Sequence, residues 1–331
     1  MSSDKKLIVS ASPHVGSNAS ARRIMLDVII ALSPSLVAAT IIFGFRSLAV
    51  TAVSIISCVF FEYISRKAMK RPNTIGDLSA VVTGLLLAYN LPVSIPLWMA
   101  VIGSAVAIVV VKQMFGGIGQ NFVNPALLGR IVLLASFPTA MATWTSPFAW
   151  QGAESTTTAT PLALMQEGGA ELPSLMQMLL GVRQGCLGEI CALALIAGGL
   201  YLVARKVISP AIPLAYIGTF AVIMLIAGKG DFEYLTYQIM GGGLLLGAIY
   251  MATDYTTSPI NFKGRIVFGI GCGIITALIR IFGSLPEGVS FSIILMNILV
   301  PHIESLTTPK PFGVEKEKRV KKSSKKEKEA V

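Results

Sequence analysis

Long apolar runs, separated by short charged or Pro- and Gly-rich breaks, recur along nearly the whole chain. A membrane-spanning helix needs about 20 apolar residues, and most of these runs approach that length. Only 13% of the residues are charged while 53% are hydrophobic, which is too little charge to cover a surface that faces water. The pattern predicts an all-α polytopic membrane protein with about ten transmembrane helices. The expected spans are 24–44, 47–65, 76–92, 95–112, 125–143, 187–204, 210–228, 235–252, 265–282 and 289–303.

These runs divide the chain into five parts. A hydrophilic leader, 1–23, precedes the first span, which has no small-residue cleavage site near its end and is interpreted as a retained helix rather than a signal peptide. Two five-helix halves, 24–143 and 187–304, flank a long loop at 144–186, and a basic tail follows at 305–331.

The distribution of basic residues predicts the orientation. If the N-terminus is cytoplasmic, all but four of the 27 Lys and Arg residues fall on cytoplasmic segments, the exceptions being Arg46, Arg183, Lys229 and Arg280. Cytoplasmic loops of membrane proteins carry such an excess of positive charge. Both termini are therefore expected in the cytoplasm and the long loop outside it.

The net charge of +10 comes largely from the tail, where basic residues from Lys310 to Lys328 alternate with glutamates. A run of this kind is typical of a solvated tail that touches anionic membrane lipid. It does not indicate a nucleic-acid partner.

Cysteines and carboxylates offer few candidates for chemistry. Cys58 and Cys272 are expected in the helix interior, and the four cysteines are too scattered to predict a zinc or iron–sulfur site. Cys186 and Cys191, near one membrane face, are the candidates for a site shared with a partner. No acidic residue falls in the middle of a predicted span, which argues against an ion relay through this chain alone.

The outer loop carries a run of hydroxyl residues, ESTTTAT, that ends at Thr160. Composition alone predicts a solvated loop. The run resembles, however, the flavin-attachment motif of bacterial electron-transport membrane subunits, which is Asp, two variable residues, Ser or Thr, a small residue and then Ala-Thr. Thr157, Ala159 and Thr160 match, whereas Glu154 replaces the Asp and Thr158 stands where Gly is usual.

Three longer stretches and one short one resemble the same family. They are GGIGQNFVNPALLG at 116–129, MATDYTTSP at 251–259, EGVSFSIILMNILVPHIE at 287–304 and SPH at 12–14. They follow one another in order over nearly the whole chain. The family is that of RnfD, a component of the Rnf complex, together with its relative NqrB, a component of the sodium-pumping NADH:quinone reductase.

The resemblance implies that a dedicated flavin transferase attaches FMN to Thr160 through a phosphoester bond, with Thr157, Thr158 and Ala159 completing the attachment motif. It also implies a noncovalent riboflavin, the other Rnf subunits as partners and the bacterial inner membrane as location. Electron flow between ferredoxin and NAD would be coupled to Na⁺ or H⁺ movement. Iron–sulfur and nucleotide sites would belong to the other subunits.

Five predicted spans precede the outer loop and five follow it, so the two halves enter the membrane from opposite sides. This arrangement suggests a five-plus-five inverted repeat, whose ligands bind where the halves meet. The flavin ring is therefore expected between the halves, with Gly84 and Gly243 giving it room. Asp254, at the cytoplasmic end of the eighth span, is expected to serve an ion or partner site rather than to contact FMN.

Two other interpretations use the same helices. A channel or facilitator for a small polar solute would suit spans without central charges, and a structural scaffold would need no site at all. A covalently bound flavin distinguishes the redox component from both, because neither a channel nor a scaffold needs one.

Overall fold

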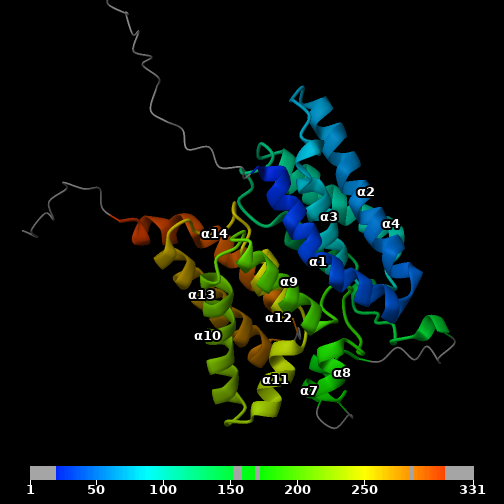
Figure 1. Cartoon of the computed structure of the whole chain (residues 1–331), viewed down its shortest axis with the longest axis vertical. Coiled ribbons are helices and arrows are strands. Elements are labelled where there is room, and N and C mark those ends of the chain that lie inside the picture. Colours follow the sequence, from blue (N-terminus) through cyan, green and yellow to red (C-terminus); the bar gives the residue numbers. More distant parts are fainter. Residues whose placement is uncertain (1–19, 152–158, 168–171, 284–286, 310–331) are drawn as a thin grey trace, which may run out of the picture.

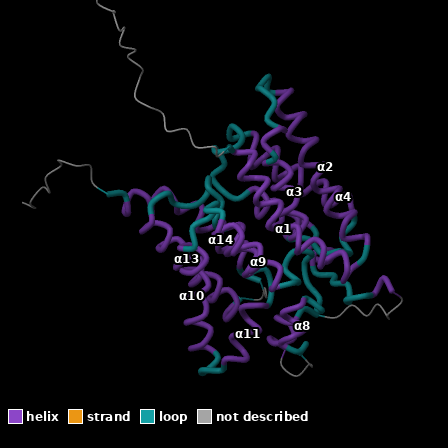
Figure 2. Tube along the Cα trace, viewed as in Figure 1, coloured by secondary structure: helices purple, strands orange, loops and turns teal. Residues whose placement is uncertain are grey.

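The computed structural model describes residues 20–151, 159–167, 172–283 and 287–309. Helices joined by loops make up this part of the chain, and no strand occurs within it (Figures 1 and 2). The all-α fold predicted from the apolar runs is confirmed.

The first half contains five helical spans, most of them shorter than the sequence predicts. They are α1 (Ala21–Phe43), α2 (Phe45–Ala68), α3 (Ser79–Tyr89), α4 (Leu97–Ala105) with its π-helical continuation η2 (Val106–Gln113), and α5 (Pro125–Ser136). The short helices η1 (Ile75–Asp77) and α6 (Pro138–Met141) flank α3 and α5.

The second half follows the outer loop, which itself contains η3 (Ala149–Gln151), α7 (Pro161–Glu167) and α8 (Leu175–Leu180). The spans are α9 (Ala192–Ala204), α10 (Ala211–Ala227), α11 (Phe232–Met240) with α12 (Leu244–Leu246) and π-helical η4 (Gly247–Met251), α13 (Phe262–Phe282) and α14 (Val289–Thr307).

Helix length supports a membrane location. Among the described residues, α1, α2, α13 and α14 are each long and apolar enough to cross a bilayer. The remaining spans are shorter apolar helices of 10–17 residues or are broken. The protein is thus a multi-pass membrane protein that combines long helices with shorter and interrupted ones.

The structure corrects three predicted boundaries. The fifth span breaks at Phe137, and the eighth breaks at Gly241 and Gly242, where Gly242 has a φ of 62°. The tenth was expected to end near Pro301, but α14 continues through that proline to Thr307.

Packing within each half follows the same order. In the first half α2 packs against α3 and α4, and in the second α10 packs against α11 and α13. Contacts of α1 with α9 and of α5 with α14 join the halves. The inverted repeat stays a prediction, but this order of contacts is the one that it requires.

Interrupted helices meet where the halves join. The side chain of Asn90, which ends α3, contacts the Met251 sulfur at 3.6 Å, and Met251 ends η4. Asn124 caps α5 by accepting from Ala126 N and Leu127 N, and it donates to Met251 O at 3.2 Å. Backbone groups freed by broken helices thus find partners across the interface.

Candidate functional site

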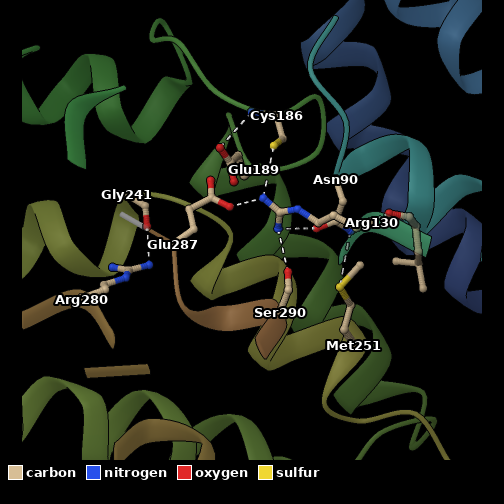
Figure 3. A network of polar contacts seen from close by, with 10 residues as sticks. Asn90, Arg130, Cys186, Glu189, Gly241, Met251, Arg280, Glu287 and Ser290 are labelled. Carbon is tan, nitrogen blue, oxygen red and sulfur yellow. Dashed lines mark hydrogen bonds and ion pairs between the residues drawn. The ribbon is translucent and has the colours of Figure 1, made fainter. Parts of the chain in front are cut away.

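Arg130, in the middle of α5, is the centre of a buried polar network at this interface (Figure 3). Its guanidinium group forms an ion pair with Glu287 and donates to Ser290 Oγ at 2.9 Å and to Asn90 Oδ1 at 3.1 Å. It also lies 3.8 Å from the Cys186 sulfur. One arginine therefore connects α3, α5, the end of the outer loop and the start of α14.

Glu189 completes the network from the loop before α9. Its carboxylate accepts from Cys186 N at 2.8 Å, and its backbone carbonyl accepts from Arg183 at 2.5 Å. Gly243 lies between the two sides of the network, since a Cβ there would be 3.4 Å from Glu189 Oε2 and 3.9 Å from Arg130 Nη1. The break in the eighth span therefore lies directly beside the charged groups.

Arg280 is the third buried arginine of the region. It donates to Gln238 O at 2.5 Å and to Gly241 O at 3.1 Å, and its guanidinium lies 4.9 Å from the centre of the Phe220 ring. These bonds hold the carbonyls that the break after α11 leaves free.

Positive charge exceeds negative charge in this cluster. Arg130, Arg183 and Arg280 are all less than 9% exposed, and each lies within electrostatic range of Glu189 and Glu287. The described part of the cluster thus holds three guanidinium groups and two carboxyl groups. Because a buried charge without a counterion is costly, this surplus favours an anionic ligand.

A cavity of about 500 Å³ opens beside the cluster. Arg130, Glu287 and Ser290 line one side, and Trp144 and Phe291 contribute aromatic rings. Its volume lies in the range of about 300–1,000 Å³ that is usual for ligand sites.

The threonine predicted to carry FMN lines the same cavity, as does Ala159. Thr160 is 8% exposed and directly precedes α7, and its hydroxyl accepts from Ala163 N at 3.4 Å. Leu162 of α7 packs against Gly241 and Gly242, where a Cβ would meet its side chain at 2.8 Å. The segment of the outer loop around Thr160 is therefore packed into the interface between the halves.

The other predicted site residues are distributed differently. Thr157 and Thr158 lie outside the described residues. That Gly84 gives the flavin ring room stays a prediction. A Cβ on Gly84 would lie 2.7 Å from Ile55 Cα and 2.9 Å from Ser54 O, so glycine here lets α3 pack against the backbone of α2.

Asp254 lines a separate cavity of about 340 Å³ at the opposite end of the interface, together with Asn121, Asn124, Thr253 and Tyr255. Its carboxylate accepts from Thr257 at 3.0 Å. Burial raises the pKa of Asp254 above its ordinary value, and the hydrogen bond from Thr257 opposes the shift. Among the described residues the two cavities share no lining residue, and the assignment of Asp254 to an ion or partner site stays a prediction.

Charge counting assigns Arg130 to the cytoplasmic side and Arg183 and Arg280 to the outer side, and these assignments stay predictions. What charge counting did not predict is that all three side chains are buried. Glu62, expected near a helix end, is fully buried close to the end of α2 and pairs with Lys112 at 2.7 Å. An arginine inside an apolar run was the available signal, because a buried charge in a membrane span is a functional candidate by default.

Both outer cysteines are buried, so neither presents a thiol at the described surface for a shared site. The donor atoms of Cys186, Glu189 and Glu287 lie within 4.8 Å of one another, a spacing that also suits a metal ion. The guanidinium of Arg130, however, already contacts two of these three side chains. The cluster therefore has its cation, and we assign no metal to it.

Several proteins have sequences similar to this chain over most of its length. The D subunit of the Na(+)-translocating ferredoxin:NAD(+) oxidoreductase complex of Acetobacterium woodii is 47% identical over 320 residues, covering 96% of this chain and 98% of that protein. The D subunit of the proton-translocating ferredoxin:NAD(+) oxidoreductase complex of Clostridium ljungdahlii is 42% identical over 318 residues, covering 92% and 96%. The D subunit of the ion-translocating oxidoreductase complex of Stutzerimonas stutzeri is 36% identical, covering 88% and 92%.

Family membership follows from a match over nearly the whole length. A model of the NQR2, RnfD, RnfE family matches residues 8–313, which include both helical halves and the outer loop. With this match and relatives up to 47% identical, the chain belongs to the NQR2, RnfD, RnfE family.

Proposed function

We propose that this chain is the membrane-embedded D subunit of an ion-translocating ferredoxin:NAD oxidoreductase of the Rnf type, and that it carries FMN on Thr160. Two relatives that match this chain over almost their whole length are named as that subunit. The chain is then one redox carrier in a larger complex whose electron flow is coupled to Na⁺ or H⁺ movement, and not a complete enzyme alone.

One observation carries the cofactor assignment: Thr160 and Arg130 line the same cavity. A phosphodiester between Thr160 and the ribityl chain has one negative charge, which equals the surplus among the described residues of the arginine cluster. Arg130 Nε is buried and has no hydrogen-bond partner in the described part of the chain, so the cluster offers an unused donor as well as an unused charge. A channel or a scaffold would give no reason for either feature.

Each residue has a defined part in holding such a cofactor. Arg130 would neutralise the phosphodiester, while Glu287 and Ser290 fix its guanidinium in place. The rings of Trp144 and Phe291 provide apolar surface for an aromatic ring system. Bound flavin supplies the chemistry, since it exchanges one or two electrons and can connect unlike carriers.

Production with and without a flavin transferase tests the attachment. The chain made together with the transferase should give a fluorescent flavin band on a denaturing gel, and the chain made alone should give none. A band of equal strength in both preparations would contradict enzymatic attachment.

We propose further that the noncovalent riboflavin implied by the family resemblance binds in the cavity around Asp254. Apolar walls suit the ring, and the carboxylate of Asp254 with the amide of Asn121 suits the ribityl hydroxyls. Replacing Asp254 with Leu should lower the flavin released by acid, because an acceptor is lost, and should leave the gel band unchanged. Unchanged acid-released flavin, measured by chromatography, would argue against this site.

We place the chain in the bacterial inner membrane with both termini in the cytoplasm. Gln151 is exposed within the outer loop, and the four native cysteines are buried, so background labelling should be low. In intact cells an impermeant maleimide should label Gln151→Cys and not Ser323→Cys, which lies outside the described residues. Labelling of Ser323→Cys alone would show that the topology is the reverse of the one proposed.

A further inference from the structure

A third cavity, of about 330 Å³, lies at the end of the molecule where α9 stops and α10 and α13 begin. Two basic residues line it, Lys206 and Arg265. Four hydroxyl residues line it as well: Ser209, Thr253, Tyr255 and Ser258. Among the described residues no carboxylate lines it: Asp254 lines the neighbouring cavity, and Glu304, which accepts from Ile260 N, lines neither. The pocket is therefore positively charged.

Several donors in this pocket have no partner in the described part of the chain. Arg265 uses Nε to donate to Pro259 O at 3.1 Å, which leaves both terminal nitrogens of its guanidinium unpaired. Lys206 likewise forms no ion pair there. Ser258 is only 8% exposed, and its hydroxyl has no partner among the described residues, although it lines the cavity. A buried hydroxyl and two cations that converge on one cavity favour an anion with several oxygen acceptors, such as a phosphate group.

The surroundings of the pocket indicate which phosphate it meets. Ile260 and Phe262 are 75% and 65% exposed, and Leu214, in the first turn of α10, is 70% exposed. Apolar side chains this exposed, next to a basic pocket at the end of membrane helices, are placed to contact acyl chains. The positive-inside pattern puts this end of the protein at the cytoplasmic leaflet, whose surface is rich in anionic lipid.

We propose that this cavity binds the headgroup phosphate of an anionic phospholipid, with Lys206, Arg265 and Ser258 as its ligands. The bound headgroup would connect the loop after α9 to the start of α13. Val207 and Tyr255 line both this cavity and the one around Asp254, and the Tyr255 hydroxyl donates to Val207 O. The lipid would therefore stabilise a wall of the Asp254 cavity. The proposal is independent of FMN at Thr160.

The test compares the wild-type full chain with a double variant that combines Lys206→Gln and Arg265→Gln. The matched control, Lys263→Gln with Lys70→Gln, removes the same amount of charge from two exposed residues that do not line the cavity. Each purified protein is titrated with phosphatidylglycerol, and retained lipid is counted by native mass spectrometry while thermal unfolding is recorded. The wild type and the control should retain one lipid that the double variant loses, and apparent affinity should fall about tenfold or more in the double variant.

Two results would overturn the proposal. If the double variant folds and binds phosphatidylglycerol as the control does, the two basic residues are not its ligands. If inorganic phosphate alone raises the unfolding temperature as much as the lipid does, the ligand is a free anion. Should the double variant fail to fold, Ser258→Ala, which removes only a hydroxyl, replaces it and is expected to weaken lipid retention in the same assay.

Discussion

Replacing Thr160 with Val is expected to abolish covalent flavin entirely. The substitution keeps the shape of the side chain and removes the hydroxyl that would form the phosphoester, so no partial attachment should remain. Thr160→Ser keeps a hydroxyl at nearly the same place and should retain part of the signal. The measurement is flavin fluorescence of the denatured protein, normalised to protein stain.

Thr143→Val is the matched control for this change. Thr143 lines the same cavity, but its hydroxyl donates to Thr139 O at 2.7 Å within the chain. The same isosteric change there should leave fluorescence at the wild-type level. Full fluorescence of Thr160→Val would show that the flavin is attached elsewhere.

Arg130→Gln is expected to lower the free energy of unfolding by about 3–5 kcal/mol, because it leaves the largely buried carboxylate of Glu287 without its cation. The double variant Arg130→Gln with Glu287→Gln should be more stable than the single one, since neither charge then remains unpaired. Unfolding by denaturing detergent in mixed micelles provides the measurement.

Arg205→Gln provides the comparison for an exposed pair. Arg205 reaches Asp27 at 3.4 Å with a side chain that is 52% exposed, so its loss should cost no more than about 1 kcal/mol. If Arg130→Gln lowered the free energy of unfolding as little as Arg205→Gln does, the buried network around Arg130 would not stabilise the interface between the halves.

The sequence predicted the helices well and their interruptions poorly. Apolar runs locate spans because lipid requires them, whatever the tertiary structure. The break at Gly241 is different, since its free carbonyl is satisfied by Arg280 from α13, some 40 residues away in the chain. A local pattern cannot reveal such a partner.

The candidate site, too, could be predicted only in part from the sequence. Thr160 came from a resemblance to a known motif, whereas composition predicted only a solvated loop. Arg130 was assigned to the cytoplasmic surface because charge counting assumes that every arginine lies at a helix end. Its partners are Asn90, Cys186, Glu287 and Ser290. These residues lie far apart in the sequence, and only the fold brings them together.

Peptide mass spectrometry of the chain produced with its flavin transferase tests the central claim most directly. Cleavage should yield a peptide containing Thr160 whose mass is increased by one FMN less one water, and fragmentation should place the addition on Thr160. An unmodified Thr160 peptide from protein that still shows a covalent flavin band, or fragments that place FMN on another residue, would contradict it.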